Sequence, residues 1–128
     1  MTKSECCGEI TEHLRNQGYR PEVDEDGDIR FNAEGVAYFV IPPDNNPYYN
    51  IITMGRWWVK DVGERTRMMT ACNEASRRVK CAKVWILKDT VAISIEAYCA
   101  SVGAFLATFA RSLSAMQTAA EAYEEAMR

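Results

Sequence analysis

The sequence predicts an α+β fold: a mainly antiparallel sheet with helices packed on one face, in the order α-β-β-β-α-β-β-α. Short runs that alternate apolar and polar residues follow one another with only turn residues between them, which is typical of antiparallel strands. Apolar residues at helical spacing precede, interrupt and follow these runs, and such helices cover one face of a sheet. The 128 residues show no linker or repeat, so we expect a single domain over residues 1–128.

The first helix is expected over residues 4–17. Cys7, Ile10 and Leu14 form a short apolar stripe at helical spacing. Gly18 is suited to end the helix in the left-handed conformation. The acidic segment 24–27 then has the composition of a turn.

Three strands are expected next. The segment 28–32 (DIRFN) alternates apolar and polar side chains, and a tight turn leads into 36–41 (VAYFVI). Pro42 and Pro43 end that strand because proline has no N–H to donate to a neighbouring strand. After a loop, the segment 48–58 (YYNIITMGRWW) is rich in the aromatic and β-branched residues that favour strands.

A second helix is expected from Asp61 to about Lys80, because Asp61 and Glu64 resemble a capping box. A β-hairpin should follow over residues 82–98. Its second strand is expected to turn alternate residues to one face, namely Val91, Ile93, Ile95 and Ala97.

The last helix carries the longest pattern in the chain. Over residues 102–127 apolar residues recur at spacings of three and four, which predicts one seam that must be covered. Such a helix would be roughly 40 Å long, whereas a compact chain of this size has a diameter of about 36 Å. We therefore expect the first half to pack on the sheet and the second half to overhang. Met116, Tyr123 and Met127 would then be free to bind a partner or a second copy.

Trp57 and Trp58 form the second candidate binding surface. Adjacent residues of a regular strand face opposite sides of the sheet. Either one ring lies on the less covered face, or the strand ends and both rings fold over its rim. Exposed aromatic rings favour protein contacts, but a helix or loop of the chain itself would explain the same residues equally well.

No catalytic or metal site is expected, and no cofactor. A calcium loop would place Glu22, Asp24 and Asp26 at its first coordinating positions, but its twelfth position, which should be a bidentate Glu, is Ala33. The chain has one histidine and none of the paired cysteine spacings that bind zinc.

Composition narrows the partners and the compartment. The formal net charge of −3 argues against a nucleic-acid partner. No apolar run reaches the roughly 18–20 residues that a membrane span requires, and the first residues lack the apolar core of a secretory signal. The five cysteines fit reduced thiols. We therefore expect a cytoplasmic protein with no membrane partner.

Two stretches resemble the YbjN family of bacterial proteins, whose members are labelled sensory transduction regulators. They are residues 14–41, which contain the pattern G-[YF]-x-x-x-x-D-x-D-G-D-I, and residues 73–86 (NEASRRVKCAKVWI). The resemblance implies a fold like that of type III secretion chaperones, which are small acidic proteins that usually act as dimers, and it implies no catalytic residues. The chain departs from the family in its cysteines and in the segment 42–49 (PPDNNPYY).

Together these features predict a non-enzymatic protein-binding module, chaperone-like or regulatory, that acts as a homodimer. The alternative from another class is a thiol-based redox sensor or enzyme that uses Cys6 and Cys7, two adjacent thiols near the start of the chain. The residues expected to bind protein are Trp57, Trp58, Met116, Tyr123 and Met127.

Overall fold

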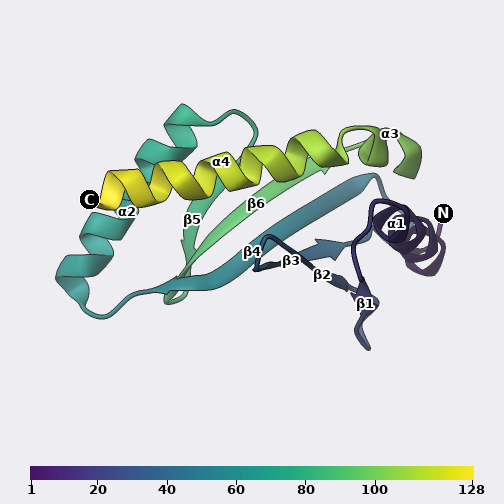
Figure 1. Cartoon of the computed structure of the whole chain (residues 1–128), viewed down its shortest axis with the longest axis horizontal. Coiled ribbons are helices and arrows are strands. Elements are labelled where there is room, and N and C mark those ends of the chain that lie inside the picture. The colour runs from purple at the N-terminus through teal and green to yellow at the C-terminus, as the bar shows by residue number, and fades with distance from the viewer. The chain divides into compact units, whose positions relative to one another are not determined.

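The computed structural model describes all 128 residues and confirms the α+β class (Figure 1). Its strands form one six-stranded antiparallel sheet in the order β1-β2-β3-β4-β6-β5. Two features differ from the predicted order, an additional short strand after the first helix and a terminal helix in two pieces. The elements are α1 (Lys3–Asn16), β1 (Glu22–Val23), β2 (Ile29–Ala33), β3 (Val36–Ile41), β4 (Tyr48–Trp58), α2 (Val62–Arg78), β5 (Lys83–Leu87), β6 (Thr90–Tyr98), α3 (Val102–Ala107) and α4 (Phe109–Met127).

The contacts of the chain group into two compact units. The first comprises residues 1–53 and 96–110, and the second comprises residues 54–95 and 111–128. Each unit has its own buried apolar side chains. The single domain expected over residues 1–128 stays a prediction.

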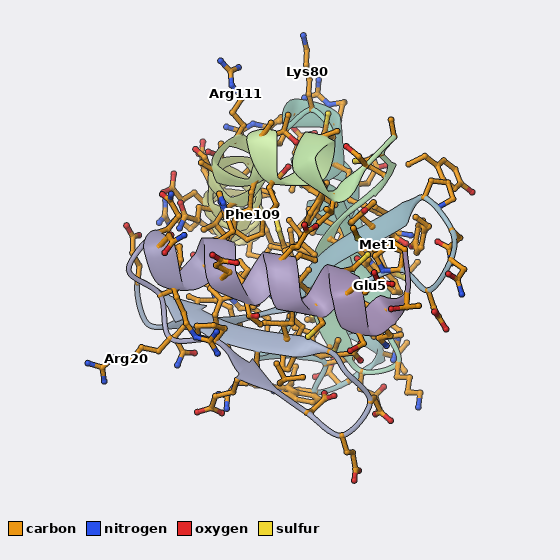
Figure 2. The ribbon with its side chains drawn as sticks, turned by 90° about the vertical axis from the view of Figure 1, so that its right-hand side faces the viewer. Met1, Glu5, Arg20, Lys80, Phe109 and Arg111 are labelled. Carbon is orange, nitrogen blue, oxygen red and sulfur yellow. The ribbon has the colours of Figure 1, made fainter.

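In the first unit, α1 begins with a capping box. The Glu5 N–H donates to the Thr2 hydroxyl at 3.2 Å, and the Thr2 N–H donates to the Glu5 carboxylate at 3.0 Å. Figure 2 shows Phe109 beside α1, where its ring lies 6.0 Å from that of His13. Aromatic rings build the core of this unit, namely those of Tyr19, Phe31, Tyr38, Tyr49, Phe105 and Phe109.

The strand that the sequence did not predict is β1. Its two residues pair with Ile29 and Arg30 of β2. The acidic segment between the two strands is a turn, as expected, in which the Asp24 carboxylate accepts the N–H groups of Asp26 and Asp28 at 2.9 and 3.0 Å. A strand this short carries too little alternation to be recognised from sequence.

In the second unit, Asp61 caps α2, and its carboxylate accepts the Glu64 N–H at 2.8 Å. Only this half of the predicted capping box is present, because the Glu64 carboxylate accepts the N–H of Lys60 instead of that of Asp61. The outer edge of β5 faces this helix. The hydroxyl of Ser76 accepts the Val84 N–H at 2.9 Å and donates to the Val84 carbonyl at 3.2 Å. One serine thus occupies the two backbone groups that Val84 would otherwise offer to another strand.

Strand β6 is buried on both faces over most of its length. All residues from Thr90 to Ile95 are buried, so both faces of this segment are covered. Trp85 of β5 accounts for the second face, because it pairs with Ala92 and its indole N–H donates to the Ser94 hydroxyl at 3.1 Å. Ala92 and Ser94 thus share the face that Trp85 covers, which agrees with the predicted alternation, although the sequence did not predict that both faces are buried.

The terminal helix is not continuous, and its second half does not overhang. It breaks at Thr108, whose N–H and hydroxyl both donate to the Phe105 carbonyl at 3.2 Å, a tight local bonding that interrupts the regular helix. Met116 is 0 % exposed and Tyr123 is 1 % exposed. The seam is therefore covered by the chain itself, and the expectation that these two residues are free is wrong.

Figure 1 shows α4 beside α2, and the two helices are joined by polar contacts. Arg67 donates to the Met127 carbonyl at 3.0 Å, and Arg78 approaches Glu125 to 3.4 Å. None of the helices is both long and apolar enough to span a bilayer.

Candidate functional site

A cavity of about 480 Å³ lies in the second unit, among the end of β4, the start of α2 and the end of α4. Its volume falls within the roughly 300–1,000 Å³ that is usual for ligand pockets. Four of the five residues expected to bind protein line it, namely Trp57, Trp58, Tyr123 and Met127. The sequence placed these residues on two separate surfaces, whereas the fold brings them to one.

Gly55 explains how two adjacent tryptophans reach one cavity. Its φ of +87° is a conformation that residues with side chains rarely adopt, and it disturbs the regular alternation of β4. The Trp58 indole folds back over this glycine and donates to its carbonyl at 3.0 Å. Neither arrangement left open by the sequence is found as stated, because β4 continues through Trp58 and both rings nevertheless line one cavity.

Thr90 holds the irregular backbone in place. Its side chain is buried, accepts the Gly55 N–H at 3.0 Å and donates to the Trp57 carbonyl at 3.0 Å. A single hydroxyl thereby satisfies a donor and an acceptor in the irregular part of β4.

The apolar wall of the cavity is built on Trp57. Its ring lies 4.7 Å from that of Tyr123, tilted by 50°, and the Arg56 guanidinium lies 4.3 Å above it on a cation–π contact. Burial raises the pKa of Tyr123 to about 12, so the phenol is neutral near pH 7. Trp58, at 59 % exposed, leaves an aromatic surface open to solvent.

Charged groups surround this wall. Glu124 lies 3.9 Å from the Arg56 guanidinium, and the Glu64 carboxylate accepts the Lys60 N–H at 3.2 Å. The ammonium of Lys60 and the guanidinium of Arg128 have no ion-pair partner. The Glu64 carboxylate is thus hydrogen-bonded within the chain and Glu124 is only loosely paired, whereas two of the cavity's cations have no ion-pair partner.

Met116 is the one predicted binding residue that does not line the cavity, and it is fully buried. The polar rim and the buried Met68, which also line the cavity, were not predicted from the sequence. One signal was available, since a glycine inside an aromatic strand often marks an irregularity that redirects side chains. Protein binding by the predicted residues stays a prediction.

The thiols do not resemble a redox centre. Cys6 and Cys7 are both buried, and burial raises the pKa of Cys7, which disfavours the reactive thiolate. Cys6 and Cys99 line a different cavity of about 420 Å³ in the first unit, beside Tyr49. Cys81 is the exposed cysteine and lies outside both cavities. These positions weaken the thiol-based alternative.

The acidic turn gathers three carboxylates. One oxygen each of Asp24, Asp26 and Asp28 lies within 4.8 Å of the others. The ammonium of Lys3 stands beside them, 2.9 Å from Asp28, and the hydrogen bond with Asp28 raises the pKa of Lys3. Glu22, the first position of the calcium loop considered above, is paired in a strand. The chain thus supplies its own cation to this cluster.

The sequence and the fold were each compared with those of known proteins. The profile of the family described as T3SS (YopN, CesT) and YbjN peptide-binding chaperone 1 matches residues 8–127. The crystal structure of YbjN from E. coli, described as a candidate transcription regulator, has a similar fold, with a TM-score of 0.68 at 10% sequence identity over 92% of this chain and 91% of that one. No curated protein matches the sequence. Because the profile spans most of the chain, the protein belongs to the family of T3SS and YbjN peptide-binding chaperones.

Proposed function

We propose that this protein is a non-enzymatic, chaperone-like module that binds a peptide segment of a protein partner in the cavity beside Trp57 and Trp58. The observation that carries the proposal is that two tryptophans, a tyrosine and a methionine converge at one surface cavity. Aromatic and methionine side chains are the groups that protein-binding surfaces favour. The family description, which names peptide binding, supports the same assignment.

The edges of the sheet favour the cavity over strand addition. An added peptide strand needs an exposed row of backbone donors and acceptors. At the β5 edge, Ser76 occupies those of Val84, and at the opposite edge β1 has only two residues. A side-chain cavity therefore fits the binding role better than either edge.

The composition of the cavity fits a role without catalysis. No cysteine, histidine or serine lines it, so it holds no Cys–His or Ser–His pair. Its two carboxylates make contacts within the chain: that of Glu64 accepts the Lys60 N–H just before α2, and that of Glu124 lies 3.9 Å from Arg56.

The test measures binding of the protein to an array of overlapping peptides from an unfolded substrate protein. Trp58→Ala should weaken binding about tenfold, the effect of removing a central aromatic contact, and the fold should survive because this ring is largely exposed. Tyr98→Ala is the matched control, since Tyr98 is exposed and does not line the cavity. Equal binding by wild type and Trp58→Ala, or equal loss in both variants, would contradict the proposal.

The homodimer and the cytoplasmic location are also part of the proposal. Because Met116 and Tyr123 are buried, a dimer would have to use other residues. Light scattering should give a dimeric mass at micromolar concentration, and a monomeric mass throughout would remove the homodimer from the account.

A further inference from the structure

Resting on the proposed function, we propose that the cavity beside Trp57 and Trp58 selects peptides in which an apolar side chain is flanked by acidic residues. The apolar wall would take the apolar side chain, and the charges at the rim would favour acidic residues on either side of it.

The apolar part of the site has room for an anchoring side chain. Its volume is about 480 Å³, and its apolar side chains come from β4, α2 and α4. Met68 is 2 % exposed and Tyr123 is 1 % exposed, so both are held by packing, whereas Trp58 is 59 % exposed. A side chain that inserts between the fixed wall and Trp58 would remove much of that exposed ring from water.

The rim carries more available positive than negative charge. Three cations, Arg56, Lys60 and Arg128, line the cavity together with two carboxylates. The Glu64 carboxylate already accepts a backbone N–H at 3.2 Å. Lys60 and Arg128 have no ion-pair partner and are exposed. Unpaired cations beside an apolar cavity attract carboxylates on the same ligand.

Arg56 adds a directional donor to this rim. Its guanidinium is held over the Trp57 ring at 4.3 Å. Its nearest carboxylate, that of Glu124, lies at 3.9 Å, which is beyond hydrogen-bond distance. A ligand carboxylate could therefore accept hydrogen bonds from the Arg56 N–H groups at the roughly 2.8 Å typical of a charge-assisted bond.

The expected preference for acidic flanks comes from charges at the rim, and the net charge of the whole chain acts against it. The formal net charge is −3, so a long-range field would disfavour an acidic peptide. A measured preference for acidic flanks would consequently come from the rim of the cavity, and salt should reduce it.

The test uses three fluorescein-labelled peptides that share one core of leucine and phenylalanine and differ only in flanking residues, which are acidic, neutral or basic. Fluorescence anisotropy should show the acidic peptide binding about tenfold more tightly than the basic one. Raising sodium chloride from about 50 mM to about 300 mM should shrink that difference.

Lys60→Glu should weaken binding of the acidic peptide about fivefold and leave the neutral peptide nearly unchanged. Lys80→Glu is the matched control, because Lys80 projects into solvent (Figure 2) and does not line the cavity. It should leave both affinities unchanged.

The outcomes separate this inference from the function on which it rests. If the three peptides bind equally, or the basic peptide binds best, the charge preference is overturned while peptide binding stands. If none of them binds, both proposals are overturned. If Lys80→Glu acts as strongly as Lys60→Glu, the preference comes from overall charge and the assignment to this rim is wrong.

Discussion

The ring of Trp57, near the end of β4, lies 4.7 Å from the ring of Tyr123, near the end of α4. This contact joins two features that the sequence shows as separate, an aromatic strand and an apolar helical seam. It also contributes to the burial of Tyr123, which is 1 % exposed. The candidate site depends on this pair and on the backbone that presents Trp58 beside it.

The first prediction concerns that backbone. Gly55→Ala should destabilise the protein by about 1–2 kcal/mol, because alanine is strained at a φ of +87°. Urea denaturation measures the change. Gly8→Ala is the control, since Gly8 lies in α1 with no atom within 4 Å of an added Cβ, and it should be stabilising by about 0.5–1 kcal/mol. Equal stability of Gly55→Ala and wild type would contradict the conformation described for β4.

The second prediction concerns Thr90. Thr90→Val keeps the shape of the side chain but removes the hydroxyl that bonds to Gly55 and Trp57. The loss should be about 1–2 kcal/mol, because the partly buried Gly55 N–H and Trp57 carbonyl both lose a partner. Thr70→Val is the comparison, since its hydroxyl is exposed and bonds within α2, and it should change stability little. Similar losses from the two variants would refute the bridging role.

The third prediction distinguishes the thiols. Cys81 should react first with an alkylating reagent, because it is the exposed cysteine. Cys6, Cys7 and Cys72 should react only as the protein unfolds. Mass spectrometry of timed samples measures the order, and Cys81→Ser should remove the rapid phase. Rapid modification of Cys6 or Cys7 in the folded protein would restore the redox alternative.

The fourth prediction follows from two raised pKa values in the second unit. Burial raises the pKa of Cys72 from 9.0 to about 11 and that of Tyr123 from 10.0 to about 12. The unfolded chain therefore loses these protons at lower pH than the folded chain. The two neutral side chains therefore add their full share to the free energy of unfolding below about pH 9. That share is lost as the pH rises through the folded-state pKa of Cys72, about 11, and then that of Tyr123, about 12.

Urea denaturation at a series of alkaline pH values checks this direction. Stability should fall as the pH rises above 9, and Tyr123→Phe should fall less steeply between pH 10 and 12 because it has no phenol to ionise. A steeper fall for Tyr123→Phe would show that burial of Tyr123 does not control this region of the curve.

The sequence predicted most elements because local signals marked them. Proline ends β3, and the spacing of Asp61 and Glu64 marks the start of α2. The terminal seam showed that a long apolar stripe had to be covered, but spacing alone does not say by what. The structure shows that the chain itself buries this stripe, since Met116 is fully buried.

The candidate site was predictable only in part. Its aromatic and methionine members follow from composition, whereas their meeting depends on the contact of Trp57 with Tyr123. Trp57 and Trp58 line the same cavity because Gly55 has a positive φ. The rule that adjacent strand residues face opposite sides assumes a regular backbone and does not anticipate this. The charged rim depends on loops and helix ends, where sequence patterns constrain side chains least.

The most direct test of peptide binding at this cavity follows the three tryptophan indole N–H signals by NMR during titration with the acidic peptide. Trp57 and Trp58 line the cavity, whereas Trp85 is bonded to Ser94 and does not. The account predicts that the signals of Trp57 and Trp58 shift saturably and that of Trp85 stays in place. A saturable shift of Trp85 alone, or no shift of any indole while the peptide binds, would contradict it.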